Sequence, residues 1–322
     1  INPDVIYKDG PKLIWPSAAG GHGWAPMAFS PRTGLVYVPT YDAGMQLQVL
    51  PRQLRFLPGT NNQAAEGHFP PFTQEQLAGR PQSKFEGRLT AWDPVAGKAR
   101  WTAPSPTFLS GGTMVAGNLV FQGNAAGYLN AYDAASGKQV AHIFVGTAIN
   151  AAPMTYELDG VQYIAVLAGA GGPQGIFFGP GVVAGERENY QRLIVLKVDG
   201  GKIPLPDKRQ PQQLPPLPKA IPASAAVLAK GQALFMDHCS RCHAAGGAIA
   251  VYPNLWTMPQ GTIDSFDQIV GKGALVYGGM GNFSNVLSPS DISAIKAFIV
   301  NDTISRRSGK GTTVKERSLQ TH

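Results

Sequence analysis

The sequence predicts a mainly β protein that ends in a small all-α domain. The chain of 322 residues contains 39 glycines and 27 prolines but only 15% charged residues, a composition typical of short strands and tight turns. A strand-and-turn segment recurs before residue 203, and apolar residues take helical spacing after residue 223. The hydrophobic fraction of 43% excludes a disordered chain.

The repeat is clearest where residues 86–98 align with residues 126–138. Each copy has a glycine, an alternating strand and an Asp-x-x-x-Gly-Lys turn, in which glycine can supply a positive φ. Residues 191–202 form a degenerate third copy, and Trp101 follows the first copy where the next strand should begin. A repeat of roughly 40–50 residues built from short strands is typical of a β-propeller. Residues 20–200 are therefore expected to form about four blades.

Prolines mark the boundary between the two parts. Their density between 204 and 222 excludes regular helix and sheet, and it favours an extended, semi-rigid linker. We predict a propeller segment at 1–203, the linker at 204–222, a helical domain at 223–302 and a basic flexible tail at 303–322. The stretch 42–84 is expected to include an insertion loop.

The charge distribution argues against nucleic-acid binding. The chain has 27 Lys and Arg against 20 Asp and Glu, a net charge of +7, and the excess lies in 204–230 and 303–322. A nucleic-acid-binding protein is expected to carry a basic stripe on a folded face. The tail is interpreted as a solvated end, with contact to an acidic partner or an anionic membrane surface as the alternative. No apolar run approaches the roughly 20 residues of a transmembrane helix. Because the chain starts at Ile1, we expect it to be part of a longer product.

Two helices are predicted in the C-terminal part. Residues 223–238 form the first. The second begins at Ser288-Pro289-Ser290-Asp291, with Ser288 as N-cap, proline at the first position and an acidic residue at the third. Its buried face is predicted to consist of Ile292, Ile295, Phe298 and Ile299.

The first of these helices ends at Cys239-Ser240-Arg241-Cys242-His243. The spacing C-x-x-C-H is the attachment signature of c-type haem. Two thiols three positions apart add to the two haem vinyl groups, and the adjacent imidazole reaches the iron. These are the only cysteines in the chain, and a structural zinc site would need four ligands. A thioredoxin-like pair would need a βαβ context. We predict covalent haem c on Cys239 and Cys242, with His243 as an iron ligand.

A methionine is the expected sixth ligand, because methionine ligation raises the haem potential for electron transfer. Met280 lies in a glycine-rich loop just before the second helix, where the backbone can approach the haem closely. Met236 lies on the first helix and is expected to point away, and Met258 precedes a proline and is expected to pack. We therefore predict Met280 as the sixth ligand.

The histidines outside the motif are weaker candidates. His22 and His238 are further candidate ligands by residue type, and His238 is expected to be exposed. His68 and His142 have no partner pattern.

Residues 224–302 resemble a class I cytochrome c, including Gly231, Phe235 and Tyr252-Pro253-Asn254-Leu255. A propeller, a proline-rich linker and a cytochrome together resemble a type II quinohaemoprotein alcohol dehydrogenase, an enzyme that uses pyrroloquinoline quinone (PQQ). This resemblance runs through essentially all of residues 5–300. It is carried by the strings Ile14-Trp15-Pro16-Ser17, Gly20-Gly21-His22-Gly23-Trp24-Ala25-Pro26-Met27, Ala91-Trp92-Asp93-Pro94, Gly111-Gly112-Thr113-Met114, Phe121-Gln122-Gly123-Asn124 and Asn150-Ala151-Ala152-Pro153-Met154.

The resemblance implies an eight-bladed β-propeller with PQQ near its axis beside a calcium ion. It implies that an aspartate base assists hydride transfer from an alcohol to PQQ, and that electrons then cross to the haem. It also implies export to the periplasm, where haem c maturation takes place. Trp24 would line the PQQ pocket, with a packing role as the alternative. Its neighbour is typically an asparagine that donates a hydrogen bond to the quinone, whereas Gly23 has no side-chain donor.

The resemblance covers only the second half of the propeller. The catalytic aspartate, the calcium ligands and a vicinal cysteine pair of the family lie earlier, so we expect no catalytic residue in this chain. It implies an N-terminal propeller half as partner, in the same precursor or as a second chain, and a downstream acceptor such as a cytochrome or a blue copper protein. The alternatives are a non-enzymatic electron-transfer cytochrome on a propeller docking fragment, and a binding propeller with a sensory cytochrome. The alcohol is not specified, although Phe177 and Phe178 are expected near the pocket mouth.

Overall fold

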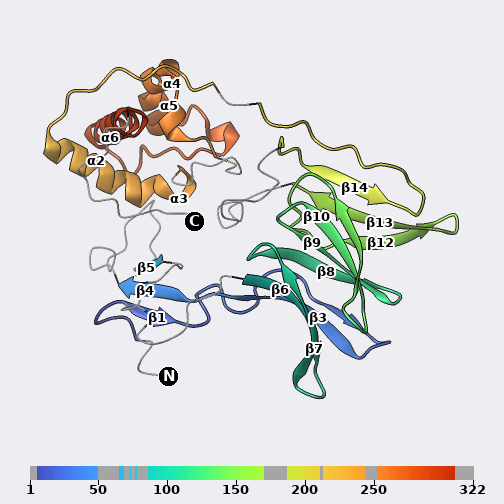
Figure 1. Cartoon of the computed structure of the whole chain (residues 1–322). Helices are drawn as coiled ribbons and strands as arrows, with labels where there is room; N and C mark the ends of the chain where they lie inside the picture. The colour runs from blue at the N-terminus through green and yellow to red at the C-terminus, as the bar shows by residue number, and fades with distance from the viewer. Residues whose placement is uncertain are drawn as a thin grey trace. The chain divides into compact units, whose positions relative to one another are not determined.

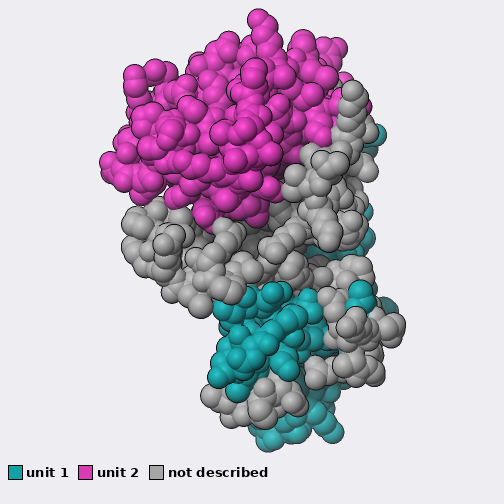
Figure 2. Space-filling view, turned by 90° about the vertical axis from the view of Figure 1, so that its left-hand side faces the viewer, with its two compact units in different colours: residues 1–51, 65–209 teal, residues 52–64, 210–322 magenta. Residues whose placement is uncertain are grey.

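A computed structural model describes residues 6–49, 65–68, 73, 77, 86–169, 187–210, 213–243 and 252–308 (Figure 1). The chain divides into two compact units, and along the described sequence the boundary falls between Arg209 and Gln210 (Figure 2). The first unit carries strands β1–β14, and the second carries helices α2–α6. No helix in the described ranges is long and apolar enough to cross a membrane.

Unit 1 consists of antiparallel sheets in the arrangement of a β-propeller segment, as predicted. The described strands form two four-stranded blades and one three-stranded blade, together with a small fourth sheet, rather than about four full blades. The first blade contains β2 (Ala28–Ser30), β3 (Leu35–Asp42), β6 (Glu86–Asp93) and β7 (Lys98–Ser105). The second contains β8 (Ser110–Ala116), β9 (Leu119–Asn124), β10 (Tyr128–Asp133) and β11 (Gln139–Phe144). The third contains β12 (Met154–Leu158), β13 (Val161–Ala168) and β14 (Arg192–Leu196).

The fourth sheet comes from the stretch expected to hold an insertion loop. Strands β4 (Met45–Val49) and β5 (Ala65–His68) lie between β3 and β6 in sequence, and β4 pairs with both β5 and β1 (Lys12–Ile14). Most of the described residues of this insertion therefore lie in strands rather than in a loop.

The repeat found in the sequence corresponds to one structural position. Its three copies supply β6, β10 and β14, each the third strand along its blade. The turns follow from the aspartate that ends each of the first two copies: Asp93 Oδ1 accepts from the Ala96 amide at 2.8 Å, and Asp133 Oδ1 accepts from the Ser136 amide at 2.8 Å. Gly97 then takes a φ of 64°, as the turn chemistry predicts.

Aromatic side chains join the first two blades. The Trp101 ring lies between Tyr37 and Tyr132, with ring centroids 5.7 and 6.2 Å away. The indole nitrogen and the Tyr37 hydroxyl both donate to the Ala134 carbonyl, at 3.0 and 2.8 Å. Tyr37 is fully buried, so this contact fixes the first blade against the second.

Unit 2 is helical. It contains α2 (Ala225–His238), α3 (Ser240–His243), α4 (Gln260–Asp264), α5 (Phe266–Lys272) and α6 (Pro289–Arg307), with single 3₁₀ turns at η5 (Leu255–Thr257) and η6 (Val276–Gly278). Ser224 caps α2, and Ser288 caps α6 through a capping box with Asp291. Of the predicted α6 face, Ile292, Ile295 and Ile299 are buried, and Phe298 packs partly buried against the same cluster.

Helix α6 continues five residues beyond the predicted boundary at 302. Asp302 and Thr303 are buried. The Asp302 carboxylate accepts hydrogen bonds from the Trp256 indole at 2.6 Å and from Arg306 Nε at 2.7 Å. These contacts explain why the helix extends into the stretch expected to be a tail, of which residues 309–322 lie outside the described ranges.

Each end of the predicted linker is held by the unit that it adjoins. On the propeller side, Arg192 and Arg187 donate to the Pro204 and Pro206 carbonyls, each at 2.6 Å. On the helical side, the side-chain amide of Asn301 donates to the Ile221 carbonyl at 2.9 Å. The described linker residues form no helix and only an isolated β-bridge at Lys208, so the predicted extended conformation is present. Its two ends, however, pack on the adjoining units.

Gly231 lies where α2 packs against α6, so a side chain at this position is expected to destabilise the helical unit strongly. A Cβ atom there would lie 2.1 Å from the Ala294 carbonyl oxygen, a backbone atom of α6 that cannot move aside alone. We expect Gly231→Ala to lower the free energy of unfolding of the helical unit by about 3 kcal/mol, the upper range for overpacking. Urea unfolding followed by helical circular dichroism measures it. Gly261→Ala, where a Cβ meets nothing within 4 Å, is the matched control, and an equal loss in both variants would contradict the prediction.

The capping box of α6 predicts a pH dependence. Lys230, whose Nζ lies 2.7 Å from Asp291, and the Ser288 hydroxyl lower the pKa of the Asp291 carboxyl from 3.8 to about 2. Because the folded-state pKa is depressed, the stabilisation is complete above pH 4 and is lost as the pH falls toward 2. We expect Asp291→Ala to cost about 1 kcal/mol at pH 7. The difference in the free energy of unfolding between wild type and variant, measured in urea, should disappear between pH 4 and 2. A constant difference over that range would refute the stabilising role of the ionised Asp291 carboxylate.

Candidate functional site

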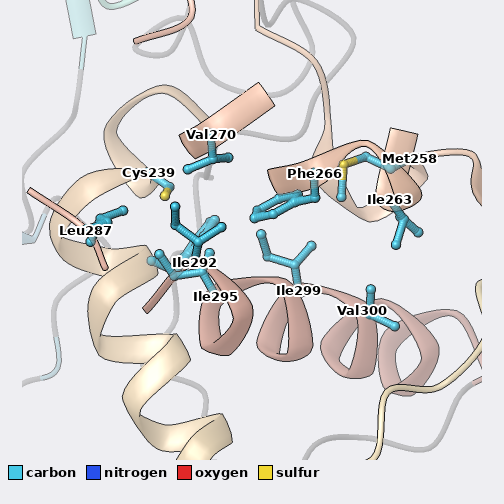
Figure 3. Close-up of a cluster of buried hydrophobic side chains, with 11 residues drawn as sticks. Cys239, Met258, Ile263, Phe266, Val270, Leu287, Ile292, Ile295, Ile299 and Val300 are labelled. Carbon is cyan, nitrogen blue, oxygen red and sulfur yellow. The ribbon is translucent and has the colours of Figure 1, made fainter. Parts of the chain in front are cut away.

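One helical turn presents the three groups of the C-x-x-C-H motif. Cys239 caps the C-terminus of α2, and Cys242 and His243 lie on α3. The amides of Cys242 and His243 donate to the Cys239 carbonyl, at 3.1 and 3.0 Å. Both thiols are free, and Cys239 belongs to the buried hydrophobic cluster of unit 2 together with Val270, Leu287 and Ile292 (Figure 3). The two thiols and the imidazole therefore project from a single compact turn beside an apolar core.

The imidazole of His243 is held in one tautomer. The side chain is 8% exposed, and its Nδ1 lies 2.9 Å from the Pro253 carbonyl oxygen. A carbonyl can only accept, so Nδ1 is the donor and Nε2 is the nitrogen left to bind a metal ion. Metal-bound histidines are oriented by such a bond from the other ring nitrogen. The residues present therefore fit an iron bound at Nε2.

The thiol chemistry differs from that of a redox pair. Burial, and secondarily the neighbouring Cys242, raises the pKa of the Cys239 thiol to about 12. Reactive cysteine pairs depend on the thiolate, which is scarce at neutral pH under these conditions. A thioether requires no thiolate in the finished protein, so the environment of Cys239 fits covalent haem attachment.

The three methionines of unit 2 occupy different environments. Met280 is half-buried and packs against the cluster that contains Cys239. It follows Gly279, whose φ of 87° ends η6, and its amide donates to the Leu275 carbonyl at 3.2 Å. Met258 is buried within the cluster, near Phe266 (Figure 3), and Met236 is exposed on α2. Among these side chains, Met280 alone combines partial burial with a position on a glycine-shaped turn.

The structure gives contacts for three of the four weaker histidine candidates. His238 is half-buried rather than exposed, because its ring packs edge-on against Phe283 with centroids 6.3 Å apart. His142 stacks on Tyr128 at 3.9 Å and its Nδ1 lies 2.6 Å from Asn130 Oδ1, partners that the sequence pattern did not reveal. His22 lies in unit 1, apart from the motif in the chain, and the side chain of His68 is outside the described part of the structure.

Unit 1 carries a second candidate site around Trp24. This side chain is 50% exposed, so it is not a core packing residue. It borders a hollow of about 380 Å³ that is also lined by Asn150 and Arg192. Asn150 Oδ1 and Arg192 Nε are buried atoms without a hydrogen-bond partner. One unpaired acceptor and one unpaired donor beside an open indole face fit a planar, polar, anionic group such as PQQ.

Phe177 and Phe178, which are expected near the mouth of this pocket, lie outside the described residues. In the described ranges, no three His, Cys, Asp or Glu side chains come close enough together to hold a metal ion.

Comparison with known families matches both units. Residues 5–164 match the family described as glucose/ethanol/alcohol dehydrogenase, beta-propeller domain. Residues 226–299 match the family described as cytochrome C oxidase, cbb3-type, subunit III.

Individual relatives align with nearly the whole chain, across both units. The chain is 34% identical over 307 residues to quinohemoprotein alcohol dehydrogenase ADH IIB of Pseudomonas putida, covering 93% of this chain and 42% of the relative. It is 36% identical over 305 residues to the quinohemoprotein alcohol dehydrogenase of Comamonas testosteroni, covering 91% and 41%. The chain therefore spans less than half the length of these relatives.

Solved structures agree with the sequence comparison. The quinohemoprotein alcohol dehydrogenase ADHIIG of Pseudomonas putida HK5 superposes with a TM-score of 0.77 at 28% identity, over 94% of this chain and 45% of that one. The Comamonas testosteroni enzyme superposes with a TM-score of 0.67 at 31% identity, over 92% and 43%. The chain thus combines a PQQ-type propeller segment with a cytochrome c domain, and the relatives that match more than 90% of its length are quinohaemoprotein alcohol dehydrogenases.

Proposed function

We propose that this chain is part of a periplasmic quinohaemoprotein dehydrogenase that oxidises alcohols with PQQ and relays the electrons through haem c. The observation that carries the proposal is the motif turn of Cys239–His243. It presents two free thiols and an imidazole locked by the Pro253 carbonyl, in a chain whose first unit is a PQQ-type propeller segment.

In the helical unit, Cys239 and Cys242 would hold the haem through thioethers, and His243 Nε2 would bind the iron. Met280, on the turn after Gly279, would offer its thioether sulfur to the iron, and such a ligand raises the potential at which the iron accepts an electron. The buried cluster that contains Cys239 would limit the access of water to a haem attached there, which would also favour the less charged reduced state.

In the propeller unit, Trp24 offers its exposed ring face to the cofactor, and Asn150 and Arg192 face the same hollow. Bound beside these residues, PQQ would supply the two-electron redox chemistry of alcohol oxidation, which the side chains of this unit cannot supply themselves. Gly23 contributes no side-chain donor, so hydrogen bonds to the cofactor come from other residues. We propose that the calcium ion and the catalytic aspartate are supplied by the N-terminal half of the propeller.

The last blade supports the need for that half. Its described strands expose large apolar side chains and present an open sheet edge, surface that usually requires a partner. These side chains are Met154, Leu158, Leu167, Leu193 and Val195. Electrons would leave the haem to a downstream acceptor such as a cytochrome or a blue copper protein.

A second function is favoured by Gly23, which has no side-chain donor for the quinone. In that case the chain is a non-enzymatic electron-transfer cytochrome on a propeller docking fragment.

Haem reduction distinguishes the two functions. The purified chain is mixed with PQQ, calcium and a primary alcohol, with and without the N-terminal propeller half, and the haem absorbance is followed. Reduction only in the combined sample supports the dehydrogenase. No reduction in any mixture, with haem that dithionite still reduces, favours the electron-transfer protein.

A further inference from the structure

We propose that Tyr41 is a positioning residue for Trp24, and that its hydroxyl group is the reason position 23 must be glycine. The packing part of this inference depends only on contacts within unit 1. Its effect on cofactor binding rests on the proposed PQQ site.

Hydrogen bonds fasten the loop that carries Trp24 to strand β3. The Tyr41 hydroxyl donates to the Ala19 carbonyl at 2.6 Å, and the Tyr41 amide donates to the Gly21 carbonyl at 2.9 Å. His22 Nδ1 lies 2.7 Å from the Pro39 carbonyl oxygen and donates to it. Because Trp24 is half exposed, its orientation depends largely on this loop rather than on packing of its own ring.

The phenol ring of Tyr41 is itself fixed. It packs against Phe108 with centroids 4.7 Å apart and an interplanar angle of 60°. Trp24, Tyr41 and Phe108 line one small cavity of about 10 Å³, which is no more than the space of a single water molecule. The ring therefore has little room to shift.

Position 23 lies directly against this hydroxyl. A Cβ atom on Gly23 would stand 2.7 Å from the Tyr41 hydroxyl oxygen and 3.8 Å from the ring carbon that carries it. The φ of Gly23 is outside the left-handed region, so the backbone itself would accept another residue. Gly21, two residues earlier, offers a contrast, because its Cβ would meet only the Tyr41 carbonyl oxygen at 3.9 Å. The requirement for glycine at 23 thus comes from one oxygen atom.

Position 23 and Tyr41 therefore form a rigid side of the site that offers no free hydrogen-bond donor. The hydroxyl proton is committed to the Ala19 carbonyl, and burial raises the pKa of Tyr41, so the phenol stays protonated at neutral pH. Neither position 23 nor Tyr41 is then available to donate to a ligand. Tyr41 instead acts through the loop, by holding Trp24 in the position from which it contacts the cofactor.

A double-mutant cycle on unfolding of the full chain tests the packing part. Gly23→Ala should lower the folding equilibrium constant of the propeller unit on the order of tenfold, within the range for residues in contact. The same change in a Tyr41→Phe background should have an effect of less than about threefold, because the clashing oxygen is gone. Gly21→Ala is the matched control and should be near neutral. Equal effects of Gly23→Ala in both backgrounds, or an equal loss in the control, would overturn the proposal.

Cofactor affinity tests the positioning part. PQQ is titrated with calcium into the complete apoprotein, including the N-terminal half, at a temperature where all variants are folded. Tyr41→Phe keeps the ring against Phe108 but frees the Ala19 carbonyl, and it should weaken PQQ binding about fivefold, as expected for one lost positioning hydrogen bond. Tyr156→Phe, on an exposed strand of the same unit, should leave affinity unchanged. Unchanged affinity in Tyr41→Phe would refute the positioning role. Absence of PQQ binding in wild type would instead refute the proposed function and leave the unfolding cycle intact.

Discussion

Replacing both Cys239 and Cys242 by alanine is expected to abolish covalent haem attachment completely. These are the only two cysteines in the chain, so no other thiol can form a thioether with the haem vinyl groups. His243 keeps its bond to the Pro253 carbonyl in this variant, because that contact involves neither sulfur. Haem that binds through its iron alone will be lost on denaturation.

Denaturing gel electrophoresis with haem staining, together with the mass of the intact chain, measures this effect. Ser240→Ala is the matched control, since it lies between the cysteines and only its hydroxyl bond to the Met236 carbonyl is removed. The single Cys242→Ala variant should retain one thioether. Haem that remains covalently bound to the double variant would exclude the attachment role of the motif.

Replacing Met280 by alanine is expected to keep covalent haem and to lower its reduction potential by roughly 0.1 V or more, a fraction of the ~0.8 V that axial ligands span. The thioether stabilises the reduced iron, and water or a weaker ligand would take its place. The turn itself should persist, because it depends on Gly279 and on backbone hydrogen bonds of residues 275–280.

Spectroelectrochemical titration of the haem gives the potential directly. Met258→Leu is the matched control, because Met258 is buried in the cluster and leucine conserves its volume. Its potential should stay within a few hundredths of a volt of wild type, a small part of the range open to axial ligation. If Met280→Ala has the wild-type potential and spectrum, the sixth ligand is a different residue.

Features encoded by neighbouring residues could be predicted from the sequence. The haem motif depends on a fixed spacing within one turn, and the repeat depends on an aspartate that accepts hydrogen bonds from amides two or three residues later. The start of α6 at Ser288 is likewise local, since a serine, a proline and an aspartate meet within one turn. Because each of these interactions joins residues only a few positions apart, the local amino-acid sequence is sufficient to specify it.

Features that depend on distant residues could not be predicted. The exposure of His238 was wrong because Phe283, 45 positions later, packs against its ring. Helix α6 passes residue 302 because Trp256 and Arg306 share the Asp302 carboxylate. In the same way, β1 acquires its partner β4 from an insertion that the sequence presented as a loop.

The fold class, the repeat and the C-x-x-C-H spacing of the haem turn thus follow from local patterns that are visible in the sequence. The tautomer of His243, the docking of the linker ends and the relation between Gly23 and Tyr41 depend on contacts between distant residues, so they are visible only in the folded chain. The last case shows the physical reason most clearly. Gly23 has no side chain, so the sequence gives no indication of why glycine is needed there. The reason is the hydroxyl oxygen of Tyr41, 18 positions later, which would lie 2.7 Å from a Cβ atom added at position 23.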